Sequence, residues 1–148
     1  KWDLINKEEQ EKLRREYDDY MKKSLKFIRF APVVFISAKE RKGIAGLVDV
    51  VLRVENQYNF RVKTSVLNKV FNEAIFVKAP SSKKGKLKIY YISQVSTAPP
   101  AFALFLNSKD RLHLTYLRYL ENRLREAFGF EGAPIKFYLK QKEKEKKI

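Results

Sequence analysis

The chain has 148 residues, and 45% of them are hydrophobic, which is typical of a globular protein rather than a disordered one. It contains no cysteine and a single histidine, so disulfide bonds, thiolate metal sites and cysteine nucleophiles are excluded and a histidine-based metal site is not expected. Because no apolar run approaches the ~18 residues of a membrane-spanning helix, we expect a cytoplasmic protein with no membrane partner.

Positive charge is concentrated in the second half of the chain. Residues 1–60 contain 13 basic and 10 acidic side chains, whereas residues 61–148 contain 19 basic and 7 acidic ones. This asymmetry favours two units, of which the second meets a polyanion such as nucleic acid. The alternative is a lysine-rich solubilising surface of the kind found in thermophiles, although that enrichment usually raises both signs of charge together.

The first sixty residues are predicted to form a helix, a strand and a second helix. A charged stretch with apolar residues three to four positions apart predicts a helix over residues 7–27. The continuous apolar run 32–36 predicts a strand buried on both faces, and a second periodic stretch predicts a helix over residues 44–58. Since a buried parallel strand needs neighbours on its edges, we expect residues 1–60 to be the C-terminal segment of an α/β domain that begins elsewhere.

The residues that follow predict a small α+β domain. The expected elements are helix, strand, strand, helix and strand, at residues 64–77, 86–96, 102–107, 110–128 and 134–141. Thr64 or Ser65 is expected to cap the first helix and Asp110 the second. The three strands are expected to form one sheet with both helices on one face, followed by a basic tail at residues 142–148.

Two short motifs near the start are similar to the base-recognition motifs of guanine-specific GTPases. Those proteins use Asn/Thr-Lys-x-Asp followed by a Ser-Ala-Lys loop, and the matching residues here are Lys1, Asp3, Ser37, Ala38 and Lys39. In such a site the carboxylate accepts hydrogen bonds from the ring N–H and the amino group of guanine, a donor pair that adenine lacks. The resemblance implies a guanine-binding role for these five residues, although the Asn or Thr is missing.

A longer resemblance covers nearly the whole chain. The second half looks like the C-terminal domain of the EngA/Der-type double GTPases, and the segments that carry the likeness are residues 64–68, 86–91, 98–100, 116–122, 124–126, 128–132 and 134–135, with Gln94, Phe102, Phe105 and Asn107. This resemblance implies that residues 1–60 end the second GTPase (G) domain, an α/β P-loop domain, and that residues 61–141 form a KH-like domain.

The family resemblance also implies a function. Its members act in assembly of the large ribosomal subunit, so rRNA, the large subunit and the sibling GTPase domains of the same chain are the expected partners. GTP or GDP with Mg²⁺ would be bound by the parent protein. The phosphate-binding GxxxxGK[ST] loop and the switch regions are missing from this sequence. We therefore expect no catalytic residue, no metal site, no tightly bound cofactor and no GTP hydrolysis by this chain alone.

One predicted RNA-binding surface is the sheet face turned away from the helices. Strand alternation places Lys88, Tyr90 and Ile92 on that face, together with the third-strand residues Lys136, Tyr138 and Lys140. Cations interleaved with aromatic rings suit contacts to an RNA backbone combined with base stacking. The alternative is that this face docks on a sibling GTPase domain and couples nucleotide state to conformation, because an open, partly apolar face rarely stays uncovered.

A second predicted RNA-binding surface lies on the long helix. Arg111, Arg118 and Arg125 recur there at seven-residue spacing. The alternative is an ordinary solvated face on which Glu121 and Arg125 form an ion pair four residues apart. The Gly129–Gly132 segment is a GxxG sequence, the pattern with which KH domains clamp RNA, but its position between helix and strand favours a helix stop and turn.

Overall fold

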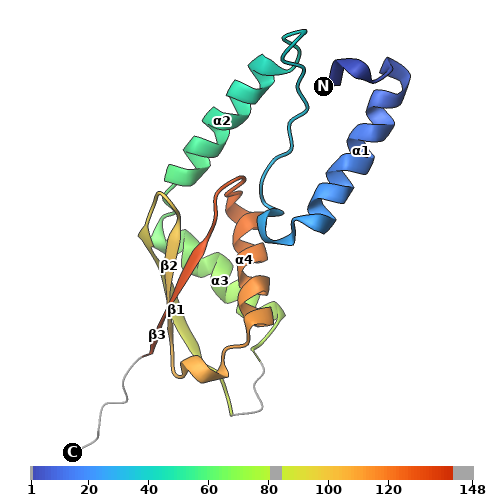
Figure 1. Cartoon of the computed structure of the whole chain (residues 1–148). Coiled ribbons are helices and arrows are strands. Elements are labelled where there is room, and N and C mark those ends of the chain that lie inside the picture. Colours follow the sequence, from blue (N-terminus) through green and yellow to red (C-terminus); the bar gives the residue numbers. More distant parts are fainter. Residues whose placement is uncertain (1, 81–84, 142–148) are drawn as a thin grey trace, which may run out of the picture.

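The computed structural model describes residues 2–80 and 85–141, so Lys1 and the predicted basic tail at 142–148 lie outside the described residues. Two long helices and an extended segment stand above a second unit in which two helices cover a sheet (Figure 1). In chain order the elements are η1 (Trp2–Leu4), α1 (Lys7–Ser24), η2 (Lys26–Ile28), α2 (Ile44–Asn59), α3 (Thr64–Val77), β1 (Ile89–Ser96), β2 (Ala101–Leu106), η3 (Lys109–Arg111), α4 (Leu114–Phe128) and β3 (Lys136–Gln141).

The predicted order helix, strand, strand, helix, strand is confirmed for the second half of the chain. The three strands form one mixed sheet in the order β1-β2-β3, with β1 antiparallel to β2 and β2 parallel to β3. The parallel pair requires a crossover connection, which α4 supplies. Both α3 and α4 lie on the same face of the sheet (Figure 1), as the sequence predicted.

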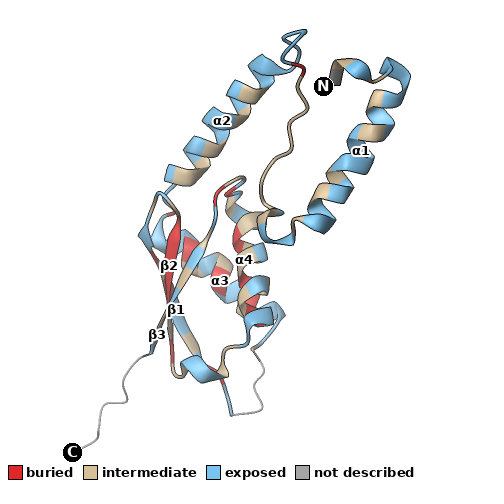
Figure 2. Cartoon of the chain, in the orientation of Figure 1, coloured by how far each residue is buried: buried red, intermediate tan, exposed pale blue. Residues whose placement is uncertain are grey.

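The hydrophobic core lies between this sheet and the two helices. The central strand β2 has the sequence AFALFL, and five of its six residues are buried. Buried residues gather on β1, β2, α3 and α4 and in the loop after α4 (Figure 2), and the largest of them are Phe71, Phe102, Phe130, Leu67, Ile92, Leu104, Leu106, Leu120 and Leu124. Among residues 3–60, by contrast, Ser37 is the only buried one, and α1 and α2 bury none. The second half therefore contains its own core.

Two amide side chains tie the edge strand β1 to the rest of the domain. Asn68 on α3 donates to the Ile92 carbonyl at 2.8 Å and accepts from the Ile92 N–H at 3.0 Å, so it takes the place of a neighbouring strand. Gln94 is buried, accepts from the Val62 N–H at 2.8 Å and donates to the Phe60 carbonyl at 2.9 Å. Because buried amides without partners are costly, these bonds also fix where α2 joins α3.

The prediction of a strand over residues 32–36 is wrong. These residues are extended but half-buried, and the nearest bridge pairs Ser37 with Lys42. A β-strand needs a neighbour to bond its backbone, and within residues 2–80 and 85–141 no strand lies alongside this segment. The apolar run 32–36 therefore has the composition of a buried strand. It does not form one here because no neighbouring strand bonds its backbone.

The predicted helix caps are also wrong. Helix α4 begins at Leu114 with His113 as its N-cap, because Lys109–Arg111 forms a separate 3-10 turn and Leu112 is extended and packs against the core. Helix α3 begins at Thr64 itself, and its N-cap is Lys63, which forms no side-chain cap. Neither helix start is fixed by a capping side chain.

Candidate functional sites

The structure brings two of the predicted guanine-binding segments together. Asp3 lies in η1 and Ser37 follows the extended segment, 34 residues later in the chain. The Ser37 hydroxyl donates a hydrogen bond of 2.6 Å to Asp3 Oδ1, and the Glu40 N–H donates to the same hydroxyl oxygen at 3.2 Å. Ser37 is fully buried, whereas Ala38 and Lys39 are exposed on the following loop. The Ser37 hydroxyl thus holds the Asp3 carboxylate at its Oδ1 atom.

The loop that carries Ser37, Ala38 and Lys39 has a fixed shape. The Ser37 and Lys42 backbones exchange hydrogen bonds of 3.0 and 3.1 Å, which close the loop at its base. Gly43 then adopts φ +76°, and a Cβ at this position would lie 2.7 Å from the Phe35 carbonyl oxygen. Only glycine fits there without a shift of the backbone. The loop is therefore presented at the N-terminal end of α2 in a defined conformation.

The environment of Asp3 keeps its carboxyl ionised. The hydrogen bond from Ser37 lowers the pKa of Asp3 most, a backbone hydrogen bond lowers it further, and the nearby positive charge of Lys39 acts in the same direction. Since the pKa lies below its ordinary value, the carboxylate stays an acceptor of hydrogen bonds throughout the neutral and mildly acidic range. An ionised acceptor is what recognition of two N–H donors requires.

Replacing Ser37 with alanine is expected to raise the pKa of Asp3 toward its ordinary value. The substitution removes the largest contribution to the lowered pKa while the Lys39 charge stays in place. An NMR titration of the Asp3 carboxyl carbon in the two proteins measures the change. An unchanged or lower titration midpoint in Ser37→Ala would contradict the account. Asp49, which is exposed on α2, serves as the reference carboxyl in the same spectra.

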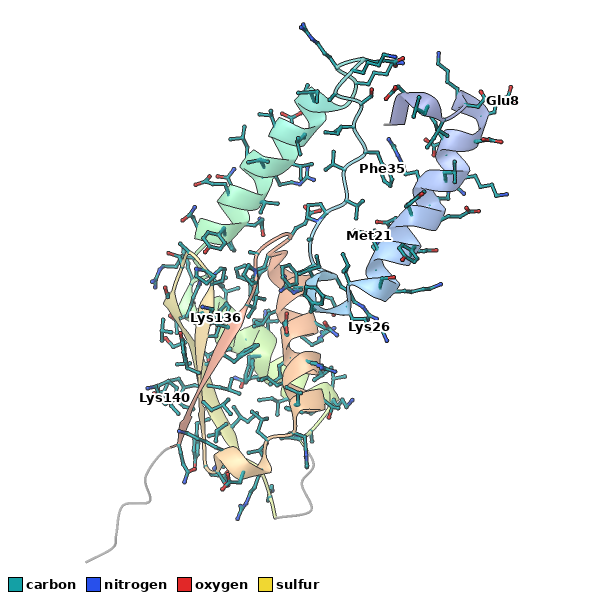
Figure 3. All side chains as sticks on the ribbon, viewed as in Figure 1. Glu8, Met21, Lys26, Phe35, Lys136 and Lys140 are labelled. Atoms are coloured by element: carbon teal, nitrogen blue, oxygen red, sulfur yellow. The ribbon has the colours of Figure 1, made fainter. Side chains whose placement is uncertain are left out.

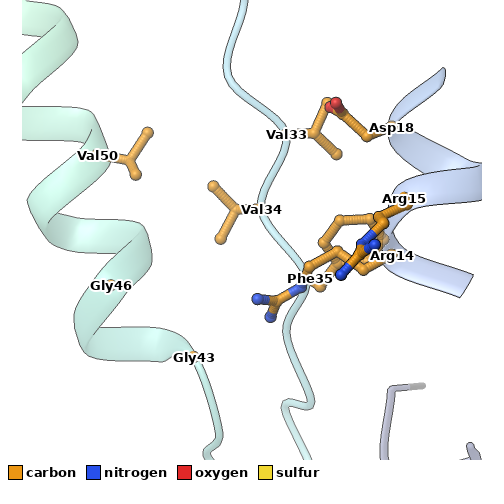
Figure 4. Close-up of a pocket in the computed structure, with 9 residues that line it drawn as sticks. All are labelled: Arg14, Arg15, Asp18, Val33, Val34, Phe35, Gly43, Gly46 and Val50. Carbon is orange, nitrogen blue, oxygen red and sulfur yellow. The ribbon is translucent and has the colours of Figure 1, made fainter. Parts of the chain in front are cut away.

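A cavity of about 500 Å³ lies between α1, the extended segment and α2 (Figure 4). Its walls include Val33, Val34 and Val50, and the Arg14 guanidinium lies 5.5 Å from the centre of the Phe35 ring. The charged side chains of Arg15 and Asp18 also line the cavity. Apolar and charged side chains thus both line the cavity, and neither Asp3 nor Ser37 is among them.

The sheet face opposite α3 and α4 carries most of the residues predicted to bind RNA. Lys136, Tyr138 and Lys140 alternate along β3 and are exposed, with half of Tyr138 accessible. Figure 3 shows Lys136 and Lys140 along this strand. The Lys88 ammonium lies 5.5 Å from the centre of the Tyr90 ring, and both residues are exposed. We call the face formed by Lys88, Tyr90, Tyr91, Lys136, Tyr138 and Lys140 the open sheet face.

The prediction that Ile92 lies on this face is wrong. The β1–β2 register shifts between Ile89 and Tyr91, so one extra residue of β1 is accommodated there. Beyond the shift Tyr91 pairs with Phe105 and stacks on its ring at 4.2 Å, while Ile92 turns into the core and is fully buried. The bulge exchanges an isoleucine for a second tyrosine on the open sheet face and makes it more suited to ring stacking.

The three arginines on and before α4 do not form one surface. Arg111 donates to the Lys86 carbonyl at 3.1 Å. Arg125 is mostly covered, donates to the Phe130 and Ala133 carbonyls at 2.7 and 3.0 Å and pairs with Glu121 at 2.9 Å. Its guanidinium is thus used to hold the loop after α4. Arg118 is exposed and has no ion pair in the described ranges 2–80 and 85–141.

The Gly129–Gly132 loop contacts the first half of the chain. Gly132 donates to the Phe30 carbonyl at 2.7 Å, and the Phe130 N–H donates to Gln57 Oε1 at 2.6 Å. Gly132 has φ +72°, and a Cβ there would lie 2.4 Å from Val54. The loop is a turn, as the sequence predicted, and its backbone bonds to residues of the chain itself.

No helix in the described portion is long and apolar enough to cross a membrane. Over the same portion, no group of three or more His, Cys, Asp or Glu side chains is placed to hold a metal ion.

Comparison with known protein families decides the affiliation of the second half. Residues 61–140 match the family described as the KH-domain-like of EngA bacterial GTPase enzymes, C-terminal. The chain belongs to this family. The three-stranded mixed sheet with α3 and α4 on one face is accordingly a KH-like domain, and the predicted α+β fold class is confirmed.

Curated relatives extend the match into residues that precede the KH-like domain. The chain is 47% identical to GTPase Der of Acetivibrio thermocellus over 146 residues, which is 98% of this chain and 33% of that protein. It is 45% identical to GTPase Der of Caldanaerobacter subterraneus subsp. tengcongensis, with 91% of this chain and 30% of that protein covered, and 43% identical to GTPase Der of Alkaliphilus oremlandii, with 96% and 32% covered. The chain therefore spans about one third of the length of these relatives.

Proposed function

We propose that the chain is the C-terminal region of a ribosome-assembly GTPase, in which the KH-like domain binds rRNA of the large subunit and residues 1–60 contribute guanine recognition. The open sheet face is the observation that carries the RNA-binding part. It combines three exposed tyrosines with three lysines on a surface that the helices of the domain leave uncovered.

The register of the strands supports a single continuous binding surface. Phe105 of β2 lies between Tyr91 of β1 and Lys140 of β3, and Ala103 lies beside Tyr138. Neighbouring strands are about 4.8 Å apart, so rings and ammonium groups recur at distances comparable to the spacing of bases and phosphates in a single strand. Ala103 is small and leaves room for a base to approach the neighbouring Tyr138. These features favour a single-stranded or looped RNA.

The guanine-binding part of the proposal depends on Asp3 and the loop at Ser37. The ionised carboxylate would accept hydrogen bonds from the guanine ring N–H and amino group, and Ser37 would hold that carboxylate in place. Backbone N–H groups near Ala38 and Lys39 would meet the guanine oxygen. GTP supplies the phosphoryl group that the parent protein hydrolyses with Mg²⁺, and the residues for that reaction belong to the parent rather than to this chain.

An alternative proposal is that the open sheet face docks on a sibling GTPase domain. It is favoured by the aromatic part of the surface, because Tyr91 and Tyr138 are each about half exposed. In that case docking would respond to the nucleotide state of the GTPase domain. Hydrogen exchange of residues 86–92 in the full-length protein tests this, since docking predicts a difference between the GTP- and GDP-loaded forms. Exchange that never differs would argue against it.

Reversing the charge of Lys136 and Lys140 in the full-length protein is expected to weaken RNA binding at least tenfold at low salt, because two phosphate contacts are replaced by repulsion. The matched control is Lys63→Glu with Lys69→Glu. Both lysines are exposed; Lys63 is the N-cap of α3 and Lys69 lies within this helix, which covers the opposite face of the sheet. Filter binding of a single-stranded RNA to the three proteins measures the difference. Equal losses in both double variants would show a non-specific charge effect and contradict the proposed surface.

A further inference from the structure

A basic pocket is formed jointly by the two halves of the chain. It has a volume of about 690 Å³ and lies between the turn after α1 and one face of α4. Lys26, Phe27 and Arg29 line it from the first half, and Arg118 and Asn122 line it from α4. Figure 3 places Lys26 at this turn, beside α4. We call it the junction pocket.

The junction pocket carries uncompensated positive charge. Its lining includes four cationic side chains, Lys26, Arg29, Arg118 and Arg125, and one carboxylate, Glu121. That carboxylate already pairs with Arg125 at 2.9 Å. Arg29 donates through Nε to the Lys22 carbonyl at 3.1 Å. In residues 2–80 and 85–141, Lys26 and Arg118 form no ion pair, so their charge remains for a ligand.

An exposed aromatic ring stands at the same pocket. Phe27 is 75% exposed, which is unusual for a large apolar side chain. An acidic peptide or a free phosphate would use the cations but would gain little from this ring. A nucleotide uses both, since its base can stack on the ring while its phosphate meets the cations. The volume also falls within the range of pockets that hold a ligand of nucleotide size.

The two walls of the junction pocket are fixed to each other. Gly132 donates to the Phe30 carbonyl at 2.7 Å, and the Arg125 guanidinium lies 4.4 Å from the centre of the Phe30 ring. Arg53 adds an ion pair of 2.8 Å with Glu131. Because each half supplies one wall, the pocket exists only while these contacts hold the KH-like domain against the preceding residues.

We infer that the junction pocket is a second RNA-binding site, which takes a nucleotide of single-stranded RNA with its phosphate on Lys26, Arg29 and Arg118 and its base on Phe27. This inference rests on the proposed RNA-binding function and adds a site that the open sheet face does not include. RNA bound there contacts both halves at once, so its affinity depends on how the two halves are positioned.

The test compares variants of the full-length protein in fluorescence anisotropy with a labelled twelve-nucleotide oligouridylate. Lys26→Glu with Arg118→Glu is expected to weaken binding about tenfold and to reduce the slope of log affinity against log salt by about 0.7, the value for one lost phosphate contact on a single strand. Phe27→Ala is expected to weaken binding about fivefold with an unchanged slope. The Lys63→Glu, Lys69→Glu protein is the control, and circular dichroism checks that each variant is folded.

The outcomes separate this inference from the proposed function. If the wild-type protein binds no RNA, both fail. If it binds RNA and loses affinity on reversal of Lys136 and Lys140, but not in the junction-pocket variants, only the junction pocket is overturned. Displacement of the RNA by polyglutamate, together with no effect of Phe27→Ala, would assign the pocket to acidic peptides and overturn the inference. A photocrosslink from a 5-iodouridine oligonucleotide to Phe27 would support it directly.

Discussion

Replacing Asp3 with asparagine in the full-length protein is expected to lower its affinity for GTP by on the order of a thousandfold and to create binding of xanthosine triphosphate. Asparagine presents one acceptor and one donor, whereas guanine offers two donors. The Ser37 hydroxyl will continue to donate to the side-chain oxygen at the position of Oδ1, which directs the new amide to the position of Oδ2. That donor opposes the amino group of guanine but matches the second carbonyl of xanthine.

Nucleotide binding measured by isothermal titration with both triphosphates tests this prediction. Asp49→Asn is the matched control, because Asp49 is exposed on α2 and the same chemical change there is expected to leave affinity for GTP unaltered. GTP selectivity that stays the same in Asp3→Asn would remove Asp3 from the guanine site.

Replacing Phe102 with alanine is expected to lower the free energy of unfolding of the KH-like domain by about 3–5 kcal/mol. Phe102 is fully buried near the start of β2, and its ring meets Phe130 edge-on with 5.8 Å between ring centres and Phe137 at 6.1 Å. The substitution leaves a cavity surrounded by strands and helices that cannot close without breaking the sheet register. A loss of this size is a large fraction of the stability of a small domain.

Urea unfolding followed by circular dichroism measures the change, and Phe76→Ala supplies the matched control. Phe76 lies on α3 and is 91% exposed, so removal of its ring is expected to change stability by less than about 0.5 kcal/mol. Similar losses in the two variants would contradict the assignment of the core to the face of β2 that carries Phe102.

Local sequence patterns correctly predicted the helices and strands that pack against a core within the described chain. Helix α3 forms over Thr64–Val77 as expected, because its apolar stripe meets a sheet that the same domain provides. The alternation along β3 likewise places Lys136, Tyr138 and Lys140 on one face. The contact between Asp3 and Ser37 agrees with the order of the two motifs, although their roles in guanine binding stay a prediction.

Other features depend on long-range contacts that a local pattern does not contain. The segment 32–36 has strand composition but no strand beside it in the described ranges. The bulge near Tyr90 comes from the pairing of β1 with β2. The alternation of inward and outward residues along one strand does not indicate at which residue the two faces exchange. Arg125 matches a seven-residue repeat, yet its guanidinium lies over Phe30, which is distant in the sequence, and bonds to carbonyls of the loop that follows α4. The junction pocket was missed for the same reason.

The salt dependence of RNA binding by the full-length protein tests the proposed function most directly. If the cationic surfaces of the KH-like domain contact RNA phosphates, log affinity should fall linearly with log salt concentration. About five contacts on single-stranded RNA would give a loss of about a hundredfold between 50 and 200 mM salt. No measurable RNA binding at 50 mM salt, or an affinity that does not change with salt, would contradict the proposal that this domain is an RNA-binding module.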